Sequence, residues 1–244
     1  MVLATLLILL GIGGLGTVWY LIAYDSNEQT ALGVPSLIFA DEKMELVGPD
    51  YRQQLVDAAN QPLVEGNVLI TYVTNASTTA TGITKEPQPG GVLMRLLDLR
   101  APDILLRNVD LSSTIGVVSA SGETRPFFVM RVTSFERTFA GMLGWESRMV
   151  QDLSDFYPPY AELAPSELTE TATSTSPVPA PAVATQPTEF VDAIAANRDV
   201  RVLRDRFGRS LIMYGYIDRQ TLIIARDETS FSVLATRLAA TSGQ

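Results

Sequence analysis

The pattern of hydrophobic and polar positions divides the chain into an apolar start and a long remainder in which apolar residues recur periodically. Residues 2–24 (VLATLLILLGIGGLGTVWYLIAY) contain no charged side chain, and charged residues occur only from Asp25 onward. A helix of this length reaches about 34 Å, which is enough to cross a bilayer core of about 30 Å. Residues 1–24 are therefore predicted to form a transmembrane anchor, with aromatic residues toward one end as in an interfacial belt.

Two other interpretations apply to the same apolar residues. A cleaved signal peptide has a basic start and a small-residue cleavage site, but no basic residue precedes Lys43 and residues 23–25 offer no clean site. The glycines of residues 11–16 (GIGGLG) fit the G-x-G-x-x-G spacing of a dinucleotide-binding turn, with Asp41 as a ribose-binding acid. Residues 18–24 are apolar all round, as lipid-facing helices are, so a membrane anchor is the favoured interpretation.

Beyond the anchor, the chain is predicted to contain a tether, two patterned segments and a linker between them. Residues 25–35 form the tether, and residues 36–160 form the first part of an α+β domain. Residues 161–188 are rich in Pro, Ala, Thr and Ser without apolar periodicity, so a disordered or polyproline-like linker is expected. Patterning resumes over residues 189–241, which are expected to pack on the first part because about 50 residues form only a marginal core alone.

Periodicity also predicts the individual elements. Helices are expected over residues 49–60, 91–100, 102–109, 134–156, 189–197 and 229–240, and a loop over residues 75–91. Strands are expected over residues 37–39, 44–47, 68–74, 114–120, 127–133, 200–206, 210–216 and 221–225. From residue 114 onward, this order favours a five-stranded sheet with packed helices, and it resembles the element order of longin, roadblock and profilin-like domains. The predicted fold class is α+β, with an N-terminal transmembrane helix followed by a mixed, mainly antiparallel sheet.

Composition restricts the chemistry that the domain can perform. The chain has no histidine and no cysteine, which excludes Ser-His-Asp and Cys-His catalysis, zinc fingers and thiolate metal sites. Its two lysines, Lys43 and Lys85, do not lie in an S-x-x-K motif. We therefore expect no cofactor and no metal, and carboxylate chemistry is the catalytic option that remains.

Arginines are frequent in one segment, residues 197–209 (NRDVRVLRDRFGR), and a basic cluster of this kind can contact nucleic acid. Asp199 and Asp205 interrupt the cluster, however, and the chain as a whole has a net charge of -9. Because an acidic protein repels a phosphate backbone, no nucleic-acid partner is expected.

Glu146 is the candidate catalytic residue, because it is the sole charge in the apolar stripe of the helix predicted over residues 134–156. A carboxylate on a packing face is either paired with a cation or available as a general acid, as in a glycan hydrolase. Asp152 and Asp155 follow on the same segment, but helical spacing turns both away from Glu146. No residue is therefore assigned a catalytic role, and Glu146 remains the one candidate.

The favoured interpretation of Glu146 is a structural ion pair with an arginine such as Arg95, Arg107 or Arg131. The same helix contains Gly141 and Gly144, each of which costs about 1 kcal/mol of helix propensity. Both glycines predict that another part of the backbone passes close to this helix.

Several stretches of the second half form a recognisable set: residues 100–102 (RAP), 127–130 (FFVM), 139–146 (FAGMLGWE) and 197–203 (NRDVRVL). Over residues 100–240 the chain resembles an uncharacterised family of single-pass membrane proteins from small-genome, candidate-phyla bacteria. The resemblance implies a location in the bacterial envelope and brings no established activity with it.

The sequence thus predicts a non-enzymatic structural or assembly protein of the bacterial cell envelope. Residues 2–24 would contact membrane lipid, anchoring the chain in the plasma membrane by a single pass. The domain would lie outside the cytoplasm and bind an envelope protein. A further expected partner is a second copy of the chain, which would make a homo-oligomer. Two alternatives stay open at this point: a peptidoglycan hydrolase that uses Glu146, and an extracytoplasmic small-molecule sensor.

Overall fold

The structure is a computed structural model that describes residues 33–79, 82–160 and 189–242. The chain divides into two compact units, Met1–Val34 and Pro35–Gln244. The membrane helix expected over residues 1–24, most of the tether and the linker expected over residues 161–188 lie outside the described residues. Within the described ranges, no helix combines the length and the apolar character needed to cross a membrane.

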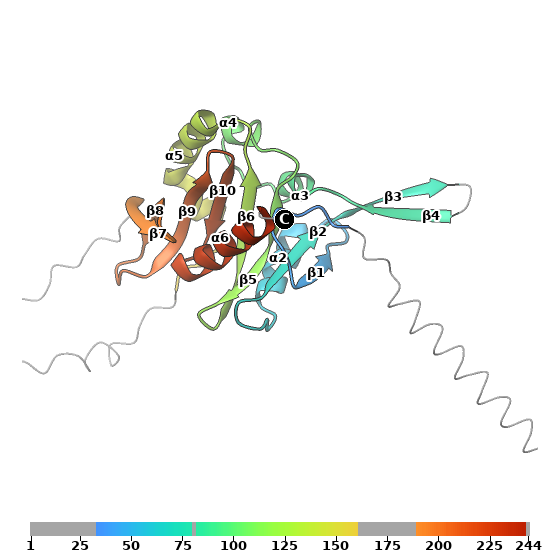
Figure 1. Ribbon diagram of the computed structural model, residues 1–244, viewed down its shortest axis with the longest axis horizontal. Coiled ribbons are helices and arrows are strands. Elements are labelled where there is room, and N and C mark those ends of the chain that lie inside the picture. Colours follow the sequence, from blue (N-terminus) through green and yellow to red (C-terminus); the bar gives the residue numbers. More distant parts are fainter. Residues whose placement is uncertain (1–32, 80–81, 161–188, 243–244) are drawn as a thin grey trace, which may run out of the picture. The chain divides into compact units, whose positions relative to one another are not determined.

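A large mixed sheet forms the centre of the second unit (Figure 1). Its eight strands lie in the order β1 (Glu42–Glu45), β2 (Val68–Tyr72), β5 (Thr114–Ala120), β6 (Glu123–Arg131), β10 (Thr221–Ala225), β9 (Ser210–Asp218), β8 (Arg198–Arg204) and β7 (Val191–Ala195). β1 and β2 are parallel, and the other neighbouring pairs are antiparallel. The α+β class with a mixed sheet is confirmed. The five strands predicted from residue 114 onward form a contiguous part of this larger sheet.

Helices cover both faces of the sheet. One face carries α2 (Tyr51–Ala59), α3 (Gly90–Leu96), the short α4 (Asp103–Leu106) and α5 (Phe135–Asp152), and α6 (Glu228–Ser242) packs against β5, β9 and β10. Phe128 and Met130 of β6 share a core cluster with Leu55 of α2 and Trp145 of α5, whereas alternate residues of β6 face the opposite side. This three-layer arrangement explains why β5 and β10 are buried along their whole length.

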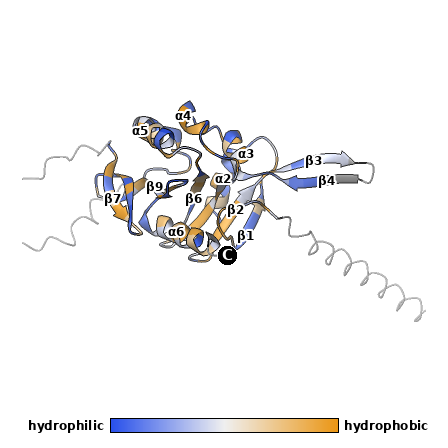
Figure 2. Cartoon of the chain, turned by 45° about the horizontal axis from the view of Figure 1, so that its top comes forward, coloured by the Kyte–Doolittle hydropathy of each residue, from blue (hydrophilic) through white to orange (hydrophobic). Residues whose placement is uncertain are grey.

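The segment over residues 75–91 was expected to be a loop, and that expectation is wrong. It forms most of a two-stranded antiparallel hairpin, β3 (Thr74–Thr79) and β4 (Gly82–Pro87), which extends away from the main sheet (Figure 1). Figure 2 shows that these strands are pale to blue, with none of the strong hydrophobic colour of β2. The side chains described on this hairpin form no buried face, so no apolar alternation marks it in the sequence and periodicity did not reveal it.

The prediction of a helix over residues 189–197 is also wrong, because this segment forms β7. Its composition, rich in alanine, favours a helix locally. Ala196 and Asn197 both adopt positive φ angles (47° and 58°), which is the geometry of a two-residue hairpin turn. The turn directs β7 into an antiparallel pairing with β8, and this pairing overrides the local propensity.

Candidate functional site

The candidate residue Glu146 lies on α5, a helix whose start and packing follow from the sequence. Ser134 caps the helix, and its side chain accepts a hydrogen bond from the backbone nitrogen of Arg137. Met142, Trp145 and Met149 are completely buried along one stripe. Glu146 follows Trp145, so its side chain lies at the margin of this stripe, with 15% of its surface exposed.

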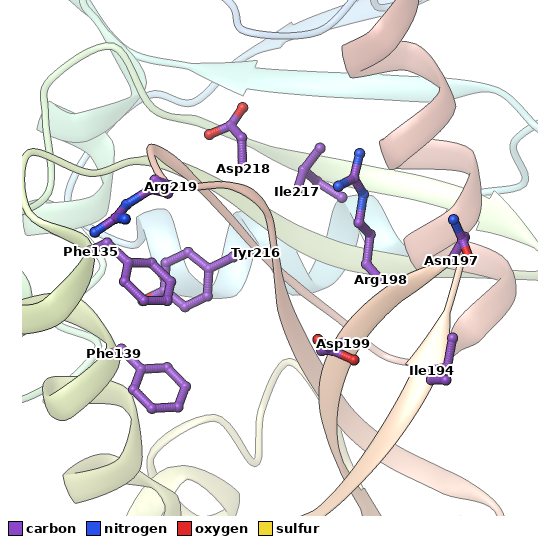
Figure 3. A pocket seen from close by; sticks show the side chains of 10 residues that line it. All are labelled: Phe135, Phe139, Ile194, Asn197, Arg198, Asp199, Tyr216, Ile217, Asp218 and Arg219. Carbon is purple, nitrogen blue, oxygen red and sulfur yellow. The ribbon is translucent and has the colours of Figure 1, made fainter.

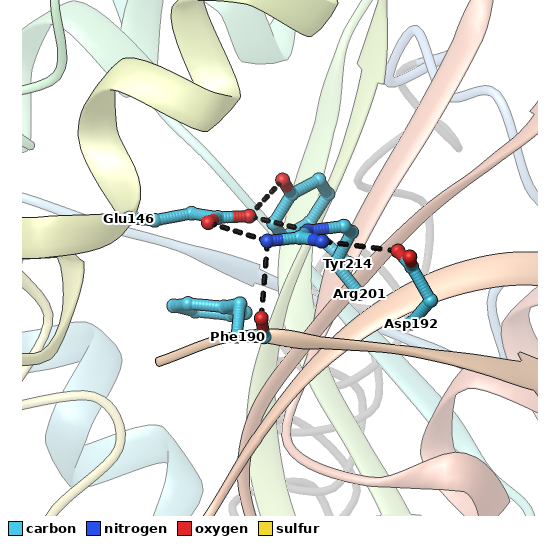
Figure 4. Close-up of polar contacts among 5 residues, drawn as sticks. All are labelled: Glu146, Phe190, Asp192, Arg201 and Tyr214. Atoms are coloured by element: carbon cyan, nitrogen blue, oxygen red, sulfur yellow. Dashed lines mark hydrogen bonds and ion pairs between the residues drawn. The ribbon is translucent and has the colours of Figure 1, made fainter. Parts of the chain in front are cut away.

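A guanidinium from β8 binds the Glu146 carboxylate with two hydrogen bonds (Figure 4). Arg201 Nε donates to Oε1 at 2.7 Å, and Arg201 Nη2 donates to Oε2 at 2.8 Å. The hydroxyl of Tyr214, on β9, donates to Oε1 at 2.5 Å. Arg201 also donates to Asp192 Oδ1 (3.0 Å) and to the carbonyl oxygen of Phe190 (3.1 Å). We call Glu146, Arg201, Tyr214 and Asp192 the ion-pair cluster.

The electrostatics of the ion-pair cluster keep its two donors protonated. The hydrogen bond to Glu146 raises the pKa of Arg201 above its usual value, although partial burial opposes the rise. Burial raises the pKa of Tyr214, and the adjacent Glu146 carboxylate raises it further. Because the donors hold their protons at every physiological pH, the cluster is a permanent connection between α5 and strands β8 and β9.

The same geometry bears on whether Glu146 can act as an acid or base. Both of its oxygen atoms already accept hydrogen bonds, and the nearest cluster carboxylate, Asp192, binds the same guanidinium (Figure 4). A glycoside hydrolase needs two carboxylates on either side of a space that admits the sugar. Here Arg201 occupies the space between the two carboxylates. The geometry favours the ion-pair interpretation, and catalysis by Glu146 stays a prediction for an activity assay.

The other residues considered with Glu146 have separate partners. Asp152 is buried and accepts a 2.8 Å hydrogen bond from Trp145 Nε1, whereas Asp155 pairs with Arg52 at 2.7 Å. The arginine that pairs with Glu146 is Arg201, so Arg95, Arg107 and Arg131 were the wrong candidates. The sequence signal was present in the arginine-rich segment of residues 197–209, but no local pattern links it to α5.

The two helix glycines behave differently from each other. A Cβ atom on Gly141 would lie 3.0 Å from Leu105 Cβ and 3.1 Å from Leu105 N, so α4 does pass close to α5 at this position. A Cβ atom on Gly144 would meet nothing within 4 Å. The close approach predicted for both positions is therefore confirmed at Gly141 and wrong at Gly144.

Next to the ion-pair cluster lies a groove that sequence analysis did not identify (Figure 3). We call it the aromatic groove. Its volume is about 590 Å³, and it lies between α5 and the strands β7, β8 and β9. Phe135, Phe139 and Tyr216 line one side, and Ile194 lines the other. Its remaining lining residues are Asn197, Arg198, Asp199, Ile217, Asp218 and Arg219.

The aromatic side of the groove is held in place by ring contacts and hydrogen bonds. The rings of Phe135 and Tyr216 meet edge to face with centroids 4.8 Å apart, and Phe139 stacks on Phe135 at 5.7 Å. The Tyr216 hydroxyl donates to Thr138 Oγ1 at 3.0 Å, and burial raises the pKa of Tyr216 to about 12. These contacts form a fixed apolar surface that stays open to solvent at Phe139, which is 36% exposed.

Across residues 33–79, 82–160 and 189–242, no three acidic, histidine or cysteine side chains converge as they would around a metal ion.

Comparison of the chain with protein-family models, with curated proteins and with solved structures found no significant match.

Proposed function

We propose that this protein is a non-enzymatic structural or assembly protein of the bacterial cell envelope. In this proposal residues 2–24 cross the plasma membrane once and contact its lipid, and the α+β domain lies on the extracytoplasmic side. The sequence supports the anchor through its uncharged apolar run. A longin, roadblock or profilin-like arrangement of the five strands from residue 114 onward remains part of the proposal.

The observation that carries the proposal is an exposed binding surface beside a rigid connection. The aromatic groove has the mixture of aromatic rings and mixed charge that typifies protein interfaces. Ile194, at its outer side, leaves 71% of its surface exposed, so an apolar side chain at the groove is accessible to a partner. Next to the groove, the ion-pair cluster holds α5 against the sheet, so the binding surface is pre-organised.

The groove also supports a second candidate function, the extracytoplasmic sensor. Its volume of about 590 Å³ is within the range of small-molecule sites. Most such sites enclose their ligand, whereas this groove is partly open to solvent, with the exposed Ile194 on one side. A protein partner therefore fits the groove better than a small molecule. A ligand-dependent rise in the melting temperature would favour the sensor.

Single-cysteine labelling tests location and partner binding together, because the chain has no cysteine of its own. Ile194→Cys places a thiol at the groove, and Ala239→Cys places one on the exposed side of α6 as a matched control. In intact cells, a membrane-impermeant maleimide should label Ala239→Cys, as expected for an extracytoplasmic domain. Ile194→Cys should react more slowly in native membranes than in the purified chain, because a partner covers it.

Two outcomes would contradict the proposal. If the maleimide labels Ala239→Cys only after the membrane is made permeable, the domain is not extracytoplasmic. If Ile194→Cys reacts equally fast in native membranes and in the purified chain, no partner covers the groove. Release of peptidoglycan fragments by the purified chain, abolished in Glu146→Gln, would instead support the hydrolase.

A further inference from the structure

We propose that the partner binds by adding a β-strand to the free edge of β7, with an apolar side chain in the aromatic groove and basic side chains beside it. This inference rests on the proposed function and names the chemistry of the partner. Among the strands of the described residues, the sheet order ends at β7, which pairs with β8 alone. An edge strand presents unpaired N–H and C=O groups, which another extended chain can pair with.

The register of the β7–β8 hairpin identifies those groups. With a two-residue turn, the facing pair Ala195–Arg198 closes the ladder with two hydrogen bonds, and hydrogen-bonded pairs then alternate along the strands. The backbone groups of Ala193 and Ala195 therefore point toward β8. Those of Asp192 and Ile194 point outward, and outside the β7–β8 ladder none of the backbone–backbone hydrogen bonds of the described residues involves them.

The two ends of the sheet differ in how they are protected. At the opposite end, β1 has the sequence EKME, and charged side chains at such density discourage strand addition. β7 has the sequence VDAIA, with Asp192 as its single charged residue, and Val191 and Ile194 are both exposed. A strand with this composition at a sheet edge is an aggregation hazard unless a partner covers it.

The charges around β7 indicate which strand fits. Over residues 189–199, the exposed charged side chains are the carboxylates of Glu189, Asp192 and Asp199 and the guanidinium of Arg198. Asp192 shares Arg201 with Glu146 and keeps 88% of its side chain exposed. Asp192 and Ile194 point to the same face of the sheet as the groove, because they are two residues apart. A strand with lysine or arginine near Asp192 and an apolar residue near Ile194 is therefore complementary, whereas a second copy of β7 would bring carboxylates together.

The test uses the full chain in lipid nanodiscs and the fluorescein-labelled heptapeptide Thr-Lys-Val-Phe-Val-Lys-Thr. Its lysine and phenylalanine side chains share one face, and its palindromic order allows either strand direction. Two control peptides carry glutamate in place of lysine, or methyl groups on the five central backbone nitrogens. The first peptide should bind, and each control peptide should bind at least tenfold more weakly.

Protein variants separate the backbone contribution from the side-chain contribution. Proline is tolerated on an edge strand where the N–H faces solvent, so Ile194→Pro removes one outward donor without breaking the β7–β8 ladder. Ile194→Ala removes the same apolar side chain and keeps the donor. Ile194→Pro should therefore weaken binding more than Ile194→Ala does. In the unaltered chain, amide hydrogen exchange at Asp192 and Ile194 should slow when the peptide is added, while exchange at Ala193 and Ala195 is slow throughout.

Each contrary result has a distinct meaning. Equal binding of the N-methylated peptide would overturn strand addition, and equal binding of the glutamate peptide would overturn the basic partner. Slow exchange at Asp192 and Ile194 in a dimer of the free chain would show that a second copy is the occupant, which also overturns the inference. If no peptide binds but a protein crosslinks to Ile194 in cells, this inference fails and the proposed function stands. If neither occurs, both fail.

Discussion

Replacing Glu146 with glutamine is the most informative single change in the domain, because it separates a structural role from a catalytic one. The amide keeps the shape of the side chain but loses the charge, and it presents an NH2 group to a guanidinium that can only donate. Arg201 then retains Asp192 as its one acidic partner, and that partner is largely exposed to solvent.

The expected cost follows from the burial of the pair. Breaking an exposed ion pair costs about 0–1 kcal/mol, and removing one partner of a buried pair costs about 3–5 kcal/mol. Glu146 and Arg201 are 15% and 23% exposed, and Asp192 partly compensates for the lost charge. We therefore expect Glu146→Gln to lower the free energy of unfolding by about 2–3 kcal/mol, which corresponds to a fall of roughly 5–10 °C in Tm for a domain of this size.

The assay is thermal and urea unfolding of the full chain in detergent, followed by circular dichroism. Glu136→Gln is the matched control, since Glu136 lies on the same helix and pairs with Arg219, but is 69% exposed. The control should cost less than about 1 kcal/mol. If Glu146→Gln unfolds at the same temperature as the unaltered chain, Glu146 is not structural and the account of the ion-pair cluster is wrong. Loss of peptidoglycan hydrolysis in that stable variant would establish the hydrolase.

Three further predictions concern α5 and the acid stability of the domain. Gly144→Ala should raise the free energy of unfolding by up to about 1 kcal/mol, because alanine has the higher helix propensity. Gly141→Ala should give no such gain, because its Cβ atom would press on α4. Urea unfolding of the two variants measures the difference. Asp152→Ala should cost about 1–3 kcal/mol, because it leaves the buried indole N–H of Trp145 unpaired, and the Trp145 fluorescence should change with it. Burial alone would raise the pKa of Asp205, but hydrogen bonds from Arg209 and the loop backbone outweigh it and lower the pKa. The stability that Asp205 contributes is therefore present above about pH 4 and is lost as the pH falls through the lowered pKa of Asp205. In the Asp205→Asn variant, Tm should consequently decrease less steeply as the pH is lowered.

Local sequence signals predicted the elements whose apolar residues face a core. The strands β5, β6, β8, β9 and β10 were recognised from their apolar residues, and α5 from its apolar stripe. In each of these elements, the burial of the side chains and the local propensity favour the same structure. Such agreement is what allows a helix or strand to be predicted from the sequence.

The elements that were missed depend on contacts made by the backbone or by distant residues. The described side chains of β3 and β4 form no buried face, and β7 forms through pairing with β8 against its own helical preference. The pairing of Glu146 with Arg201 joins positions 55 residues apart, so helical spacing could predict an arginine partner but not identify it. The aromatic groove was missed for the same reason, because Phe135, Ile194 and Tyr216 come from three separate elements.

The most direct test of the partner-binding account is crosslinking in living cells. A photo-reactive residue replaces Ile194 in the groove, and the same residue at Ala239 on α6 serves as the control. If a partner binds the groove, one defined envelope protein should crosslink from position 194 and not from position 239, and the yield should fall when Phe139→Ala is added. A diffuse set of products, the same at both positions, would contradict the claim that this surface binds a protein partner.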